Sequence, residues 1–115
     1  MKILIAVSLC FLTSCVSSKS LVGEWRYADE MQSCHYVFKK DGSFSGEVMY
    51  QRKLLSQFTG KWTVEGKTLL YQYINDAVGN IPPGAVDRDK LLNVQRAFFE
   101  IQAADGSRRK YIRVK

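Results

Sequence analysis

The sequence predicts an all-β domain built as an antiparallel up-and-down meander. Three observations predict it. Apolar and polar residues alternate with a period of two along several segments, turn-forming dipeptides separate these segments at short intervals, and aromatic and β-branched residues fill them. Such residues fit the half-buried surface of a pleated sheet. The pattern is interrupted by an apolar run at the N-terminus and by a segment rich in Pro and Gly near residue 80.

The first strands follow from this pattern in chain order. We expect them at 21–27, 34–39 and 44–50, with a hairpin turn at Asp41-Gly42 between the second and the third. Gly tolerates a positive backbone dihedral and Asp can accept a hydrogen bond from its own backbone, so this dipeptide favours a tight turn.

The clearest alternation follows at 57–64, where Phe58, Gly60, Trp62 and Val64 are expected to point inward. A turn at Glu65-Gly66 leads to the next expected strand. The remaining strands are expected at 67–74, 93–103 and 109–114, with the last two joined by a turn at 104–107.

Segment 75–92 does not follow the alternation. Pro82 and Pro83 lack an amide donor and cannot lie within a central strand. A connection of this length is unusual in a compact domain and indicates a functional loop. The equally weighted alternative is a plain crossover with a short helical turn at 87–92.

The N-terminus has the layout of a secretory signal. One charged residue, Lys2, precedes an apolar run at 3–12, and small residues follow. This run is about ten residues long, whereas a membrane-spanning helix needs about 20. The segment is therefore expected to be removed after export.

The end of this segment, Leu12-Thr13-Ser14-Cys15, resembles the lipobox of bacterial lipoproteins. The resemblance implies cleavage after residue 14, thioether diacylation of Cys15 and acylation, for example with palmitate, of its new amine. The expected organisation is a signal peptide at 1–14, a lipidated Cys with a flexible tether at 15–20, and a β domain at 21–115. The alternative is an ordinary signal peptide with an incidental Cys.

The lipobox resemblance also implies a location in the bacterial cell envelope. Two or three acyl chains on one residue give stable attachment to a membrane surface. Val16 follows Cys15, where an Asp would favour retention in the inner membrane, so in a Gram-negative cell the resemblance implies the outer membrane. The basic excess of 17 Lys and Arg over 11 Asp and Glu is interpreted as a solvated surface, and export argues against nucleic acid as a partner.

Cys34 would be the one thiol left in the mature domain, because Cys10 departs with the signal and Cys15 carries lipid. No internal disulfide is therefore expected. The Cys34 side chain lies in a strand-like run, and we favour its burial over exposure for an intermolecular bond.

Three short motifs resemble lipocalin-like domains. They are a G-x-W at 23–25, an F-x-x-D-G-x-F-x-G hairpin at 38–46 and a G-x-W-x-V-x-G-x-x-L block at 60–69. The resemblance implies a small barrel or strongly curved sheet whose interior can hold an apolar ligand. At about 100 mature residues the chain is much shorter than full lipocalins, and small barrels can be filled by their own side chains.

A ligand in such a barrel would meet large inward side chains, with its head group held at the mouth by Arg108 and Arg109. The expected lining residues are Tyr36, Phe38, Phe44, Val48, Phe58, Trp62, Leu70 and Phe99. An apolar pocket with few polar groups suits a fatty-acid-like or other amphipathic molecule.

No catalytic constellation is found in the sequence. The single His35 neighbours Cys34, so in a strand the two side chains point to opposite faces and cannot form a nucleophile pair. No zinc-type ligand spacing and no phosphate-binding loop occurs. Asp76, Asp87 and Asp89 are interpreted as solvated loop residues in preference to a cation site. We therefore expect no enzyme, no metal and no cofactor.

Two functions remain. One is a membrane-anchored binding domain for a small apolar or amphipathic ligand. The other is a structural or interaction lipoprotein that contacts an envelope protein through an exposed edge or the 75–92 segment. A hollow interior would favour the first function, and a filled core with an exposed apolar patch would favour the second.

Overall fold

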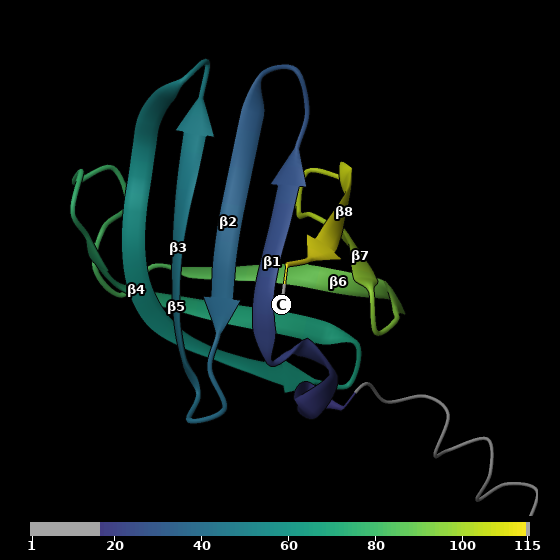
Figure 1. Cartoon of the computed structure of the whole chain (residues 1–115). Helices are drawn as coiled ribbons and strands as arrows, with labels where there is room; N and C mark the ends of the chain where they lie inside the picture. The colour runs from purple at the N-terminus through teal and green to yellow at the C-terminus, as the bar shows by residue number, and fades with distance from the viewer. Residues whose placement is uncertain (1–16, 115) are drawn as a thin grey trace, which may run out of the picture.

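The structure, a computed structural model, describes residues 17–114. Eight antiparallel strands follow one another in chain order around a closed barrel (Figure 1). The strands are β1 (Gly23–Ala28), β2 (Gln32–Phe38), β3 (Ser43–Tyr50), β4 (Lys53–Glu65), β5 (Thr68–Asp76), β6 (Val86–Val94), β7 (Phe98–Gln102) and β8 (Arg108–Arg113). A short 3-10 helix, η1 (Ser18–Leu21), precedes them. The predicted all-β meander is confirmed, and it closes into a barrel because β1 pairs with β8.

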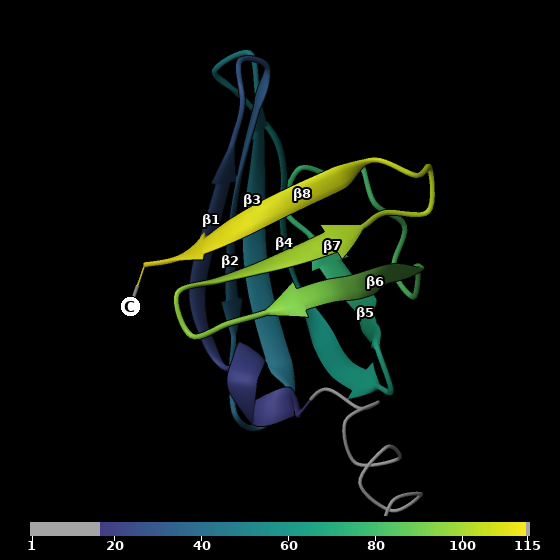
Figure 2. The same cartoon turned by 90° about the vertical axis from the view of Figure 1, so that its right-hand side faces the viewer.

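The antiparallel order gives the barrel two different ends. One end carries η1 and the β2–β3, β4–β5 and β6–β7 turns, and we call it the closed end. The other end, the open end, carries the β1–β2, β3–β4, β5–β6 and β7–β8 connections. Figure 1 shows η1 and the β2–β3 turn together at the bottom, with the β1–β2 and β3–β4 turns at the top. Figure 2 shows β6, β7 and β8 running across the long strands β1 to β4.

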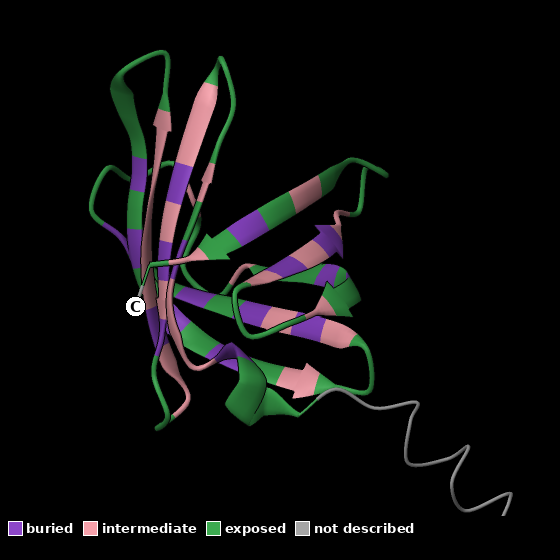
Figure 3. Cartoon of the chain, turned by 45° about the vertical axis from the view of Figure 1, so that its right-hand side comes forward, coloured by how far each residue is buried: buried purple, intermediate pink, exposed green. Residues whose placement is uncertain are grey.

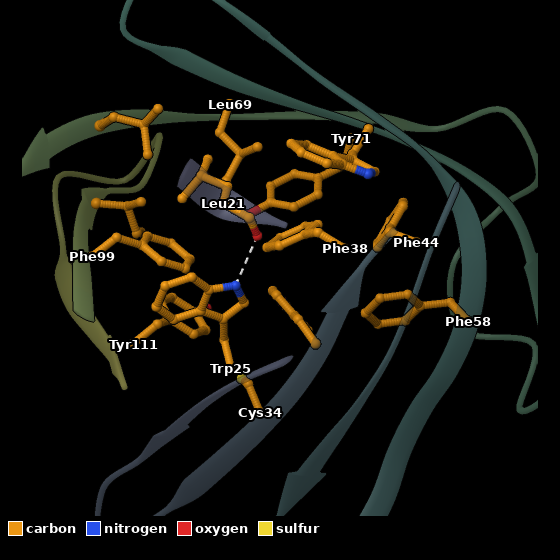
Figure 4. Packing of buried hydrophobic residues seen from close by; sticks show 14 of the residues in the cluster. Leu21, Trp25, Cys34, Phe38, Phe44, Phe58, Leu69, Tyr71, Phe99 and Tyr111 are labelled. Carbon is orange, nitrogen blue, oxygen red and sulfur yellow. Dashed lines mark hydrogen bonds between the residues drawn. The ribbon is translucent and has the colours of Figure 1, made fainter. Parts of the chain in front are cut away.

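A group of three side chains shuts the closed end. The indole Nε1 of Trp25 donates a 2.9 Å hydrogen bond to the Leu21 carbonyl oxygen, as drawn in Figure 4. The guanidinium of Arg113 lies 4.1 Å from the centroid of the Trp25 ring. Leu21 and Trp25 are fully buried. The start of the chain is thereby fixed to the last strand.

The core fills the middle of the barrel. Buried residues form bands across the strands, whereas the hairpin tips at the open end are exposed (Figure 3). Within the described residues, no helix is long and apolar enough to cross a membrane.

The predicted turns at Asp41-Gly42 and Glu65-Gly66 are confirmed. Gly42 and Gly66 have φ values of 90° and 61°, and the Asp41 carboxylate accepts a 2.9 Å hydrogen bond from the Ser43 amide. Both turns lie at the closed end.

The expectations for 75–92 are wrong in their second half. Residues 87–92 form neither a helical turn nor a loop, because they belong to β6, which pairs with β5 from Thr68↔Lys90 to Gln72↔Val86. The alternation was hidden because the inward positions include Asp87 and Asp89. The connection itself is shorter, at 77–85.

The expected single strand at 93–103 is also wrong. Asn93 and Val94 end β6, a turn occupies 95–97, and β7 begins at Phe98. The Gln95 amide donates to the Phe98 carbonyl oxygen at 2.8 Å and closes this turn. It contains neither Gly nor Pro, so residues 95–97 carry no recognisable turn signal.

Two further expectations change. Leu70 does not line the interior, because the inward positions of β5 are Leu69, Tyr71 and Tyr73. Residues 18–20 of the segment expected to act as a tether belong to η1, and residues 15 and 16 lie outside the described residues.

We predict that Gly60→Ala destabilises the barrel by about 1–3 kcal/mol, the usual cost of overpacking. A Cβ at Gly60 would collide with the carbonyl oxygen of Gln72, which is backbone and cannot rotate away, and with the Phe44 ring. Chemical denaturation measures the change. Gly66→Ala is the control, since a Cβ there meets nothing within 4 Å and costs only backbone strain. Equal effects of the two substitutions would contradict the close approach at Gly60.

Candidate functional site

The aromatic residues expected to line the interior do come together there. Tyr36, Phe38, Phe44, Phe58 and Trp62 are all buried, on β2, β3 and β4. The ring centroids of Phe38 and Trp62 lie 5.0 Å apart, and those of Tyr36 and Phe58 lie 5.8 Å apart. Edge-to-face and offset contacts at such distances are favourable.

Rings from the second half of the barrel fill the space between them. The Tyr111 ring stacks on Phe99 at 4.9 Å and on Tyr36 at 5.4 Å, and Tyr71 stacks on Phe38 at 6.0 Å. Figure 4 shows these side chains converging from both sides of the barrel. The middle of the barrel is therefore a packed aromatic layer.

The interior becomes polar toward the open end. Asp87 and Arg109 are each the second residue of a strand that starts there, and both are on inward positions. With Asp89 they face four tyrosines of the aromatic layer, and we call this group the mouth cluster. Its members are Tyr36, Tyr71, Tyr73, Asp87, Asp89, Arg109 and Tyr111.

Asp89 is the buried charge of the mouth cluster. Its side chain is only 8% exposed. Burial, and then the negative charge of Asp87, raises the pKa of the Asp89 carboxyl to about 6, while Tyr71 and Arg109 oppose this rise. A carboxyl with such a pKa is both a hydrogen-bond acceptor and, when protonated, a donor near neutral pH.

Tyr71 has a buried hydroxyl without a hydrogen-bond partner among the described residues. The Tyr71 side chain is 2% exposed, and its hydroxyl lies near Asp89 without being aligned to it as a hydrogen bond. Leaving such a group unpaired costs about 1–3 kcal/mol. The hydroxyl thus has hydrogen-bonding capacity that no described residue satisfies.

The two arginines expected to hold a head group are separated by the strand geometry. Arg109 is half-buried on an inward position, with its guanidinium 5.9 Å from the centroid of the Tyr27 ring. Arg108 is exposed on the outer face. Only Arg109 belongs to the mouth cluster.

Cys34 and His35 point to opposite faces as expected. Cys34 is a free, buried cysteine, and burial raises the pKa of its thiol. The His35 ring lies on the outer face, where its Nε2 is 2.5 Å from a carboxylate oxygen of Glu24. The two side chains form no pair that could activate a nucleophile.

Asp76 has a structural role that the sequence did not indicate. Its two carboxylate oxygens accept hydrogen bonds from the amides of Gln57, Val78, Asn80 and Ile81, at 2.9 to 3.1 Å. Burial opposes ionisation, but these donors hold the pKa of the Asp76 carboxyl below its usual range. The carboxylate folds the 77–85 loop so that Ile81 packs against the core.

Asp76 is therefore engaged by backbone and is separate from Asp87 and Asp89. No group of three or more His, Cys, Asp or Glu side chains that could hold a metal ion occurs among residues 17–114.

A groove of about 640 Å³ lies on the outer face of β4, β5 and β6. Its walls include Lys61, Leu70, Val86 and Arg88. These are outward positions, and the groove also reaches Trp62 and Tyr71 of the aromatic layer.

The comparisons with known proteins agree with this architecture. A crystal structure of a lipocalin-like protein from Bacteroides uniformis superposes on the chain with a TM-score of 0.60 and covers 82% of this chain and 98% of that one. The domain has a lipocalin-like fold. Sequence identity between the two proteins is 18%, so their similarity concerns the fold alone. No family model and no curated protein matches the sequence.

The lipocalin-like domain should become more stable as the pH falls from 7 toward 4. Asp89 has a pKa near 6 in the folded state and about 3.9 when unfolded, so the folded state binds more protons in this window. Stability lost by protonating Asp76 appears only at lower pH, because the pKa of that carboxyl is lowered.

Asp89→Asn should remove the gain between pH 6 and 4, and urea denaturation at a series of pH values measures it. Asp105→Asn is the control, since Asp105 is exposed at the β7–β8 turn. A pH profile of Asp89→Asn identical to that of the unsubstituted chain would show that Asp89 is not the titrating group.

Proposed function

We propose that the protein is a lipid-anchored envelope lipoprotein whose barrel binds a small amphipathic molecule at its open end, without performing chemistry on it. The observation that carries this proposal is the buried, unpartnered hydroxyl of Tyr71 beside Asp89. An unpaired polar group is costly inside a packed core, and a bound ligand would supply the missing partner.

The arrangement suits a molecule with two unlike parts. An apolar part would contact the rings of the packed layer, such as Tyr36 and Phe58, and a polar part would meet the mouth cluster. Because the middle of the barrel is filled, the ligand would be small and would lie close to the mouth.

The charges argue for a head group that donates hydrogen bonds. Asp87 and Asp89 stand beside the single cation Arg109, so a free carboxylate would face two like charges. Alcohols, amides or amines fit better than the fatty acid expected from the sequence, because they can donate to Asp89 and pair with the Tyr71 hydroxyl.

Anchoring rests on the sequence. Cys15 and the segment before it lie outside the described residues, and the lipobox resemblance supports their assignment. Attachment to a membrane through the lipid on Cys15, in the cell envelope and in the outer membrane of a Gram-negative cell, is part of the proposal.

An interaction lipoprotein is the second candidate. Apolar side chains are exposed on the connections of the open end and beside them, which is the feature expected of a protein contact. They are Met31, Tyr50, Leu54, Leu55 and Val78. These residues and the mouth cluster lie at the same end, so the two candidates require separate tests.

The ligand proposal is tested with the mature chain carrying Cys15→Ser, by thermal unfolding with a panel of medium-chain alcohols, amides, amines and fatty acids. A ligand that binds only the folded chain raises the unfolding temperature. Tyr71→Phe should raise the free energy of unfolding by about 1 kcal/mol and weaken a stabilising ligand roughly tenfold, the effect of one lost hydrogen bond.

Arg109→Gln should also weaken the ligand. Lys110→Gln, the same charge change on the outer face of β8, should not. If no member of the panel stabilises the chain and Tyr71→Phe lowers stability, the ligand proposal is wrong and the interaction role becomes the better one.

Lipidation is tested by intact mass spectrometry of the native protein. We expect a mature chain that begins at Cys15 and carries the mass of two or three acyl chains, and we expect Cys15→Ser to release the protein from membranes. An unmodified mature chain in the native material would rule out the anchor.

A further inference from the structure

The closed end of the barrel carries a concentration of exposed cations. Within the described residues, η1 and the three turns at 39–42, 66–67 and 95–97 contain five basic side chains and one acidic side chain, Asp41. The basic residues are Lys19, Lys39, Lys40, Lys67 and Arg96, and all are exposed. Glu65, the last residue of β4, adds a second acid beside them.

The open end has no such excess of cations. Its four connections, at 29–31, 51–52, 77–85 and 103–107, contain Asp29, Glu30, Asp105 and Arg52. The strands that follow two of these connections begin with Lys53 and Arg108, so acidic and basic side chains are balanced there. The basic excess is therefore larger at the closed end.

Arg113 brings the segments of the closed end together. Its guanidinium donates to the carbonyl oxygens of Ser20, Val22 and Arg96, at 3.0, 2.9 and 2.6 Å. These bonds fix η1 against the β6–β7 turn. Figures 1 and 2 both show η1 beside the β2–β3 turn, so the segments that carry Lys19, Lys39, Lys40 and Arg96 meet at the closed end.

In the sequence, η1 is the described element next to the proposed lipid on Cys15. Only Val16 and Ser17 separate Cys15 from η1. Three residue steps of extended chain span about 10 Å at most. This is close to the Debye length of about 8 Å at physiological salt, so a membrane that holds Cys15 lies within electrostatic range of the cations.

From the basic excess at the closed end and this short reach, we propose that the closed end is a membrane-facing surface that binds anionic phospholipid head groups. The basic surface comprises Lys19, Lys39, Lys40 and Arg96. Lys67 is not part of it, because Lys67 lines a hollow with Asp89 and Ala103. Binding through the basic surface holds the barrel with the mouth cluster turned away from the bilayer. The orientation rests on the proposed lipidation of Cys15, whereas the affinity for anionic lipid does not.

The test uses the mature chain with Cys15→Ser, since the barrel closes on itself without the lipid. Its binding to vesicles of phosphatidylcholine is compared with binding to a phosphatidylcholine–phosphatidylglycerol mixture by co-sedimentation. We expect binding to the mixture only, with a loss at high salt. Lys39→Gln/Lys40→Gln should weaken it roughly tenfold or more, because each cation near an anionic surface contributes severalfold to the affinity.

Arg52→Gln/Lys53→Gln is the matched control, an adjacent pair with the same charge change at the tip of the open end. It should bind as the unsubstituted chain does, and thermal unfolding confirms that both variants are folded. Equal binding to both vesicle types, equal losses in the two variants, or no binding to the mixture would overturn the proposal. If the native protein were unlipidated, the proposed anchor would be wrong. The vesicle-binding experiment would still decide whether the closed end binds anionic lipid.

Discussion

The position of Arg113 constrains much of the structure. Its guanidinium covers the Trp25 ring and donates to backbone carbonyls of η1, of the residue after it and of the β6–β7 turn. Trp25 in turn is bonded to Leu21. One cation thus joins the first ordered residues, the first strand and the last strand, and the barrel is shut at that end. A planar guanidinium with several donors can make these contacts together, and a Lys cannot.

The contacts of Arg113 constrain the closed end of the barrel and do not reach the open end. The interior is packed by rings whose contacts are apolar near Trp25 and become polar toward Asp89 and Arg109. A core of this size gains most from apolar burial, so the unpaired hydroxyl of Tyr71 and the buried carboxyl of Asp89 lower the stability of the domain. Groups that cost stability without supporting the fold are the ones for which a ligand is a reasonable explanation. We therefore propose the open end as the ligand site.

The same asymmetry extends to the surface. The turns of the closed end are basic and lie beside the segment that leads to Cys15, while the open end has no such excess of cations and exposes apolar side chains such as Leu55. An anchored barrel would therefore present its mouth and these apolar side chains away from the membrane. That orientation would leave the mouth and these apolar side chains accessible to a ligand or to a partner protein.

The sequence predicted the parts of the fold that depend on local chemistry. The alternation from Phe58 to Trp62 and the Gly turns depend on neighbouring residues and were confirmed. The break at Gln95 was missed because its turn has no Gly or Pro, and β6 was missed because Asp87 and Asp89 occupy inward positions where apolar residues are expected.

The candidate site was predicted only in its aromatic half. The period-two alternation of the sequence predicts that Tyr36, Phe58 and their neighbours on β2 to β4 point inward, and these side chains are buried. The polar half depends on how neighbouring strands pair, as β5 and β6 do when they bring Tyr71 near Asp89, and a pattern along one strand does not carry that information. Arg109 was anticipated and Arg108 was grouped with it, although the strand period separates them.

Native-state hydrogen exchange distinguishes a rigid closed end from an open end that opens locally. We expect the indole N–H of Trp25 and the amide of Arg113 to exchange only when the whole domain unfolds. We expect amides of the β3–β4 turn and the 77–85 loop to exchange through local opening. Exchange of the Trp25 indole at the rate of the open-end amides would contradict a rigid closed end.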